Sequence, residues 1–125
     1  MAEEEVTDTE QAVQPDQLSI AAAATDGIHV LTVAGEIDHH TGDALTQALS
    51  LSGTPRPRVV VDLRQVAFMD STGINILIAA HRALTGAGGW LRLAGPTGVV
   101  LRTLQLVGLD TIIDCHETLH QALTD

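Results

Sequence analysis

The sequence predicts an α/β protein in which a mixed, mostly parallel β-sheet packs against helices. Short apolar runs typical of strands alternate along the chain with helical patterns, as in parallel sheets built with right-handed crossovers. The unbroken run of Val59, Val60 and Val61 indicates a central strand that is buried on both faces. The predicted order of elements is β-β-α-β-α-β-α-β-α, and an opening hairpin makes the sheet mixed.

The first two predicted strands form this hairpin. Residues 18–24 alternate with a period of two, which is typical of a strand. Asp26 and Gly27 form the turn, and residues 28–33 return as the second strand. Because the first strand is rich in alanine, which has a low preference for strands, we expect it at an edge of the sheet.

A helix is predicted at residues 41–51, with Thr41 as its N-cap. One apolar stripe is expected to face the core: Ala44, Leu45, Ala48 and Leu49. A loop at residues 53–57 and the valine strand at residues 58–63 follow.

The second helix is predicted at residues 72–85, and the glycines among residues 86–89 end it. Its core stripe consists of Ile74, Leu77, Ile78, His81 and Leu84. Within this stripe we expect His81 to be partly buried, with its hydrogen bonds satisfied.

Three further elements complete the predicted fold after a strand at residues 90–94. A third helix follows Pro96 and stops at Gly108, a short strand covers residues 111–114, and a terminal helix covers residues 117–123. The residues of the third helix expected to face inward are Val100, Leu101, Leu104 and Val107.

Length and charge predict one domain with an acidic tail. Of 125 residues, we expect 1–15 to form a disordered acidic tail and 16–125 to form the domain. Sixteen acidic residues against six basic ones give a net charge of −10, which repels phosphate backbones. We therefore expect no nucleic-acid partner and favour a basic protein surface.

The chain is expected to be cytoplasmic and monomeric. It starts with acidic residues, unlike a secretory signal, and has no apolar run of the ~20 residues that span a membrane. Cys115 is the only cysteine, so no disulfide can form within the chain.

Several kinds of chemistry conflict with the residues present. The chain contains no lysine, which excludes a Walker loop and argues against a phospho-aspartate receiver built on Asp62. Ser71 could be paired with His39, His40 or His81 as a hydrolase nucleophile, but the Gly-x-Ser-x-Gly elbow is missing. Histidine and cysteine also lack metal-ligand spacing, so we expect no metal site. Because each of these kinds of chemistry lacks residues that it requires, we also expect no cofactor and no catalysis.

The segment from Asp70 to Gly73 joins the valine strand to the second helix, where either Asp70 or Ser71 could cap that helix. Capping alone is the simplest role for such residues. The helix carries further apolar residues off its core stripe, namely Ile76, Ala79, Ala80 and Ala83. These residues indicate either a docking partner or a helix buried against a neighbour, and periodicity leaves both open.

From residue 17 onward the chain resembles the STAS domain family, and within it the free-standing anti-sigma factor antagonists. Two segments carry the resemblance. Residues 35–41, Gly-Glu-Ile-Asp-His-His-Thr, are similar to the family's segment after the second strand, and residues 68–74, Phe-Met-Asp-Ser-Thr-Gly-Ile, are similar to its phosphorylation loop. Both occur at the expected places in the order of elements.

The resemblance implies a partner-switching protein that is not an enzyme. An anti-sigma factor with serine kinase activity would phosphorylate Ser71, phosphorylation would abolish binding, and a serine/threonine phosphatase would reverse it. Asn75 stands where the family commonly has glycine. The residues implied in partner binding are Glu36, Asp38, Asp70, Thr72, Gly73, Asn75 and Ile76. Two alternatives remain, a STAS scaffold that is never phosphorylated and a ligand-sensing regulatory module.

Overall fold

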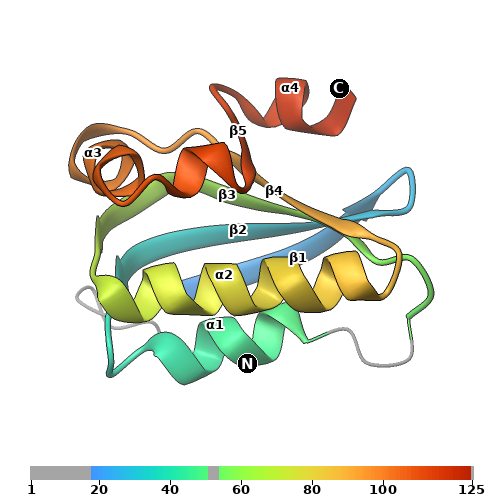
Figure 1. The fold of residues 1–125 in the computed structure, drawn as a ribbon, viewed down its shortest axis with the longest axis horizontal. Coiled ribbons are helices and arrows are strands. Elements are labelled where there is room, and N and C mark those ends of the chain that lie inside the picture. The colour runs from blue at the N-terminus through green and yellow to red at the C-terminus, as the bar shows by residue number, and fades with distance from the viewer. Residues whose placement is uncertain (1–17, 51–53, 125) are drawn as a thin grey trace, which may run out of the picture.

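The computed structural model describes residues 18–50 and 54–124. The predicted acidic tail, the predicted end of the first helix at residue 51 and the first residue of the predicted loop at 53–57 lie outside the described residues. The described chain forms a five-stranded sheet with four α-helices and one 3-10 helix (Figure 1). The elements are β1 (Ser19–Thr25), β2 (Ile28–Ile37), α1 (Gly42–Leu49), β3 (Arg58–Met69), α2 (Ser71–Gly86), β4 (Trp90–Ala94), α3 (Gly98–Leu106), η1 (Leu109–Thr111), β5 (Asp114–His116) and α4 (Leu119–Thr124).

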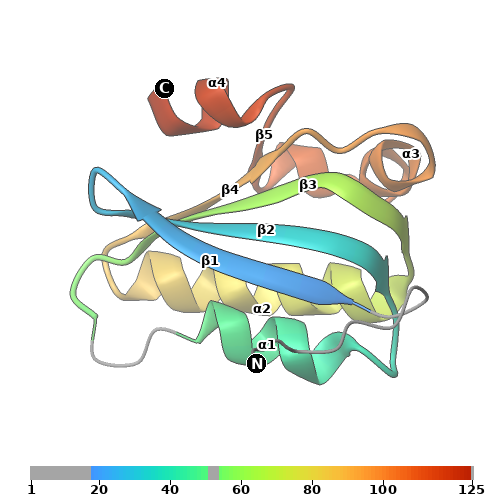
Figure 2. The same cartoon turned by 180° about the vertical axis from the view of Figure 1, so that it is seen from behind.

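The sheet has the strand order β1-β2-β3-β4-β5. β1 pairs antiparallel with β2 through the turn at Asp26 and Gly27, and all other neighbours pair in parallel. The predicted mixed, mostly parallel sheet is therefore confirmed. β1 lies at an edge (Figure 2), and the three consecutive valines of β3 are buried in the middle of the sheet.

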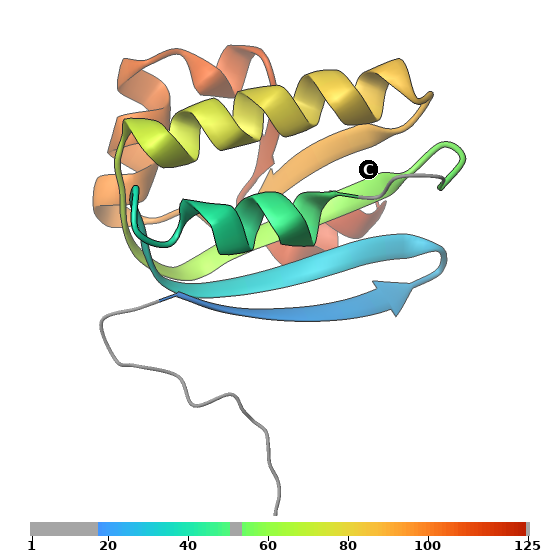
Figure 3. The ribbon, with the colours of Figure 1, turned by 90° about the horizontal axis from the view of Figure 1, so that it is seen from below.

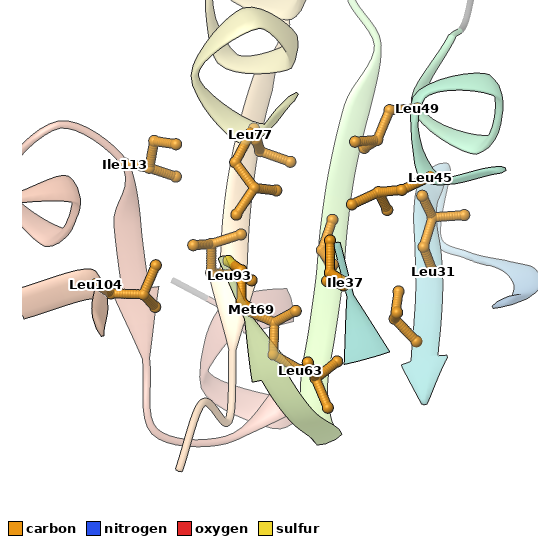
Figure 4. Close-up of a cluster of buried hydrophobic side chains, with 14 of the residues drawn as sticks. Leu31, Ile37, Leu45, Leu49, Leu63, Met69, Leu77, Leu93, Leu104 and Ile113 are labelled. Atoms are coloured by element: carbon orange, nitrogen blue, oxygen red, sulfur yellow. The ribbon is translucent and has the colours of Figure 1, made fainter. Parts of the chain in front are cut away.

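Helices cover both faces of the sheet. α1 and α2 run side by side under one face, and α4 lies on the opposite face (Figures 1 and 3). The main core lies on the α1–α2 side and extends to α3 (Figure 4). Its large buried side chains include Ile37, Leu45, Leu63, Met69, Leu77, Leu93, Leu104 and Ile113. A smaller cluster under α4 consists of Ile28, Val30, Val60, Ala94 and Ala122.

The second and third strands are longer than the sequence pattern predicts. We expected them to end at residues 33 and 63, but β2 continues to Ile37 and β3 to Met69. The pairing of β2 with β3 shifts register twice along this stretch. Such irregularities break the alternation of apolar and polar residues while backbone pairing continues, which explains why the pattern underestimates both strands.

Two expected orientations are wrong, and the expected hydrogen bonding of His81 is incomplete. Ala44 is exposed because the buried side of α1 is narrower than the predicted stripe and rests on Leu45 and Leu49. Val107 is 54% exposed because α3 ends at Leu106, before the predicted stripe is complete. His81 is partly buried as expected, but its Nδ1 atom lacks a hydrogen-bond partner among the described residues.

The region after α3 also differs from the prediction. Residues 109–111 form the 3-10 helix η1, and the last strand is Asp114–His116 rather than residues 111–114. Gly108 adopts a φ of 75°, which turns the chain after α3 as the predicted stop requires. Ile113 is buried in the main core just before β5 begins, so its apolar character reflects core packing rather than a strand position. Across the described ranges, no helix combines the length and apolar character that crossing a membrane requires.

Candidate functional site

The two segments singled out from the sequence meet at one end of the sheet. β2 and β3 are neighbours, so Glu36 lies opposite Phe68 and Ile37 opposite Met69. The backbone N–H of Asp70 then donates a hydrogen bond to the carbonyl of Ile37 at 3.1 Å. These contacts join the carboxyl ends of two parallel strands, which is where α/β sheets generally place their sites.

The loop between β2 and α1 is closed by its own side chains. The Asp38 carboxylate accepts hydrogen bonds from the N–H groups of His40 at 2.9 Å and Thr41 at 3.2 Å. The Thr41 hydroxyl donates to the carbonyl of Glu36 at 2.9 Å and accepts from the N–H of Asp38 at 3.0 Å. These bonds fix residues 36–41 in one conformation. Thr41 occupies the N-cap position of α1 as predicted, but its side chain makes no capping hydrogen bond, because the hydroxyl bonds within this loop instead.

The same bonds determine the ionisation of Asp38. Desolvation opposes ionisation, but the two backbone N–H donors and the neighbouring His40 and His39 outweigh it and lower the pKa of Asp38. Asp38 is therefore negatively charged at neutral pH. With Glu36, Asp43 and Asp70 it gives this end of the molecule several carboxylates.

The start of α2 is capped by Asp70. Its carboxylate oxygen Oδ1 accepts the N–H of Thr72 at 2.8 Å, which satisfies one of the free donors at the helix start. Ser71, the first residue of α2, is exposed. The structure thus decides between the two candidate caps and leaves the Ser71 hydroxyl outside the capping interaction.

A groove of about 510 Å³ runs between α1 and α2, beside this helix start. The sequence indicated only the side of the groove that α2 forms. The side formed by α1 and the residue after it, with Thr46, Leu49 and Ser50, was not predicted. The lining residues are Thr46, Leu49, Ser50, Thr72, Asn75, Ile76, Ala79, Ala80 and Ala83.

Two glycines set the close packing around the groove. A Cβ atom at Gly42 would lie 2.9 Å from Thr72 Cγ2, so this glycine lets α1 approach α2. Gly73 is buried, and a Cβ there would lie 2.5 Å from Met69 Cγ and 2.8 Å from Ile37 Cγ2. Gly73 therefore lies beneath the surface, whereas Asn75 is exposed and Ile76 is half-buried in the groove wall.

Phe68 is a site residue that the sequence indicates only as part of a motif. It is 41% exposed at the end of β3, beside Glu36. The chain contains one phenylalanine and one tryptophan. This scarcity of aromatic residues is the sequence signal that could have identified Phe68 as a candidate for the site.

The hydrolase arrangement is not formed in the described part of the chain, where Ser71 makes no side-chain hydrogen bond to a histidine. Residues 18–50 and 54–124 also contain no group of three His, Cys, Asp or Glu side chains that could hold a metal ion.

The fold is a five-stranded mixed sheet, and its candidate site lies where the carboxyl ends of β2 and β3 meet the start of α2. The chain belongs to the STAS domain family, whose model matches residues 19–122. The "Anti-sigma-F factor antagonist RsfB" of Mycobacterium tuberculosis (strain ATCC 25618 / H37Rv) is 34% identical over 88% of this chain and 90% of its own length. The "Anti-sigma-B factor antagonist" of Listeria monocytogenes serovar 1/2a is 32% identical over 78% of this chain and 87% of its own.

A solved structure agrees with these relatives. The crystal structure of an anti-sigma factor antagonist from Mycobacterium paratuberculosis superposes with a TM-score of 0.79 at 34% identity, covering 90% of this chain and 97% of that one. These relatives are regulators named for the factor they oppose rather than for a reaction, in agreement with the prediction of a protein that is not an enzyme.

Proposed function

We propose that this protein is an anti-sigma factor antagonist whose binding is switched by phosphorylation of Ser71. The names of the relatives, at 34% and 32% identity over most of the chain, support the antagonist role. The observation that carries the switch is the exposure of Ser71 at the start of a helix already capped by Asp70. A kinase can reach this hydroxyl without undoing a hydrogen bond of the fold.

The partner in this proposal is an anti-sigma factor that is also a serine kinase. It would contact the acidic edge formed by Glu36, Asp38 and Asp70 and insert apolar side chains into the groove. The groove wall is mostly apolar, with Ile76 and three alanines of α2 accessible from outside. Carboxylates beside an apolar groove match a partner surface that combines arginine with aliphatic side chains.

Phosphorylation would act on the partner rather than on the fold. A phosphate adds about −1.5 to −2 charges at neutral pH. The free N–H groups and the positive end of the α2 dipole tolerate that charge in the free protein. In the complex the same charge would lose water beside Asp70, and a change of about 1.4 kcal/mol already lowers affinity tenfold. A serine/threonine phosphatase would restore binding.

The test compares variants of Ser71 and Ser50. Both serines are exposed beside the groove, but only Ser71 begins α2. With the cognate kinase and ATP, we expect wild type and Ser50→Ala to gain one phosphate and Ser71→Ala to gain none. In calorimetric titrations Ser71→Ala should bind the kinase as tightly as wild type, and Ser71→Asp should bind at least tenfold more weakly. Full phosphorylation of Ser71→Ala would refute the site.

The groove itself supports a second candidate function, the sensing of a small apolar molecule. Its volume of about 510 Å³ is in the range of ligand pockets. A thermal-shift screen with nucleotides and apolar metabolites would identify a specific ligand by a raised melting temperature. The substitution Ala79→Glu should remove that shift, whereas Thr85→Glu, outside the groove, should retain it.

A further inference from the structure

The outer edge of β1 carries no further strand within residues 18–50 and 54–124. β1 is the first strand of the sheet and pairs only with β2 in the part of the chain that the structure describes. Seen from below, β1 forms one border of the molecule, and α1 and α2 lie over the inner strands of the sheet (Figure 3). In an antiparallel pair every second residue directs its N–H and C=O groups away from its partner. These groups of β1 can pair with another strand.

This edge lacks the features that usually protect an edge strand. Natural edges are kept from pairing by charges, proline, bulges or short length. β1 has the sequence SIAAAAT, with no charge and no proline, and it is seven residues long. Its pairing with β2 runs without a register shift from Ser19 opposite Ala34 to Thr25 opposite Ile28.

The side chains of β1 give it little stability within one copy. Residues 21–25 are all exposed, so neither face of this stretch is buried against the core. Alanine also has a low intrinsic preference for strands. A second strand along the free edge would supply the hydrogen bonds and side-chain contacts that the exposed alanines lack.

In place of the monomer expected from the sequence, we propose that two copies of this chain form a symmetric dimer in which their β1 strands pair antiparallel and join two sheets into one. Ala22 is the middle residue of β1, so a two-fold axis through this position sets Ala22 opposite Ala22 of the second copy. Neighbouring strands of a sheet lie ~4.8 Å apart, and the alanine side chains would point to the two faces of the joined sheet rather than between the backbones.

Charge at the two ends of β1 favours a second copy in the antiparallel direction. At the turn end, Arg58 Nη2 donates to the carbonyl of Asp26 at 3.1 Å, and Arg56 and Arg58 are both exposed. At the other end, β1 begins at Ser19, shortly after the first sixteen residues of the chain, six of which are acidic. Antiparallel pairing sets the turn end of each β1, near Arg56 and Arg58, beside the Ser19 end of the other copy, which follows the acidic part of the sequence. Parallel pairing would instead set the two Ser19 ends side by side.

Sedimentation velocity of the full chain at low ionic strength tests the dimer. We expect a reversible monomer–dimer equilibrium that shifts with protein concentration. Ala22→Glu should be monomeric, and so should Ala22→Lys, because each places like charges opposite each other at the axis. An equimolar mixture of the two variants should restore the dimer. A wild-type chain that stays monomeric at every concentration, or an Ala22→Glu variant that associates like wild type, would overturn the proposal.

Two controls separate this surface from the proposed partner site. Ala79→Glu places the same charge on an exposed alanine of the groove, so it should keep the dimer and lose kinase binding, while Ala22→Glu should do the opposite. Circular dichroism should show that both variants are folded.

A second full-length variant tests the charge arrangement, with the six acids replaced by amides: Glu3→Gln, Glu4→Gln, Glu5→Gln, Asp8→Asn, Glu10→Gln and Asp16→Asn. Antiparallel pairing predicts a weaker dimer for this variant. A tighter dimer would mean that the segments repel each other and would overturn the antiparallel arrangement.

Discussion

The carboxylate of Asp70 accepts the backbone N–H of Thr72 at 2.8 Å, and Ser71 stands between these two residues with its side chain exposed. The helix start is therefore held by the residue before the proposed phosphorylation site. This separation of tasks allows Ser71 to be modified while α2 keeps its cap. It leads to the first two predictions.

Removal of the cap should destabilise the protein. Asp70→Ala is expected to lower the free energy of unfolding by about 1 kcal/mol, the usual effect of losing a side-chain N-cap. Urea denaturation measures this change. Asp43→Ala is the matched control, since Asp43 is exposed in the first turn of α1 without a capping hydrogen bond. Equal stabilities of the two variants would show that the Asp70 bond does not hold α2.

A negative charge at Ser71 should leave the fold intact. Ser71→Asp is expected to keep the free energy of unfolding unchanged or to raise it by up to about 1 kcal/mol, because the charge lies at the positive end of the helix dipole. Thr85→Asp puts the same charge into the last turn of α2 and should lower stability by a similar amount. A loss of stability in Ser71→Asp would mean that binding is switched by unfolding of the site.

The close contact at Gly73 predicts a different response from two glycines of one helix. Gly73→Ala should lower the free energy of unfolding by about 1–3 kcal/mol, since its Cβ would meet Met69 and the branched side chain of Ile37. Gly86 ends the same helix and has no atom within 4 Å of the position of a Cβ. Gly86→Ala should be neutral or stabilising by up to about 1 kcal/mol. Thermal or urea denaturation compares the two, and equal effects would contradict the packing described for Gly73.

The hydroxyl of Thr41 should be required for the loop before α1. Thr41→Val keeps the shape of the side chain but removes the bonds to Glu36 and Asp38, with an expected loss of about 1–3 kcal/mol. Thr41→Ser retains the hydroxyl and should recover most of the stability. Proton exchange at the amide of Asp38 gives a local readout, and it should accelerate in Thr41→Val only.

Cys115 should react slowly with thiol reagents. Burial, together with the nearby charges of Asp110 and Asp114, raises its pKa to about 11. At pH 8 the thiolate fraction is then roughly a hundredfold below that of a cysteine with a pKa near 9. Alkylation by iodoacetamide should be slower by that factor in the native protein than in urea. The raised pKa also predicts that stability falls as pH rises from about 9 through 11, because the unfolded state ionises first. A native rate equal to the unfolded rate would exclude this burial effect.

Much of the fold could be predicted because its signals are local. The period of two in β1, the turn at Asp26 and Gly27, and the three valines of β3 each reflect backbone preference and burial within a short stretch. The ends of β2 and β3 could not be predicted in the same way. Their last residues are held by pairing between strands about thirty residues apart, and the register shifts disturb the alternation that marks a strand.

The candidate site shows the same division. The sequence singled out Asp70, Ser71 and the α2 wall of the groove, since these belong to one continuous segment. It did not provide the opposite wall from α1, which depends on how closely Gly42 lets two helices approach. Nor could it choose between Asp70 and Ser71 as the cap, because both side chains can accept the same N–H groups.

The sequence by itself determined the α/β class, the order of elements up to the last strand, and the position of Ser71 between a buried strand and an apolar helix. The tertiary structure decided that the Asp70 side chain caps α2 and that the Thr41 hydroxyl closes its own loop rather than bonding to the N–H groups of α1. It also decided that the Glu36 and Ser71 segments form one edge through the hydrogen bond from Asp70 to Ile37. Local preferences fix which elements form, but contacts between residues far apart in the chain decide which side chains share a surface.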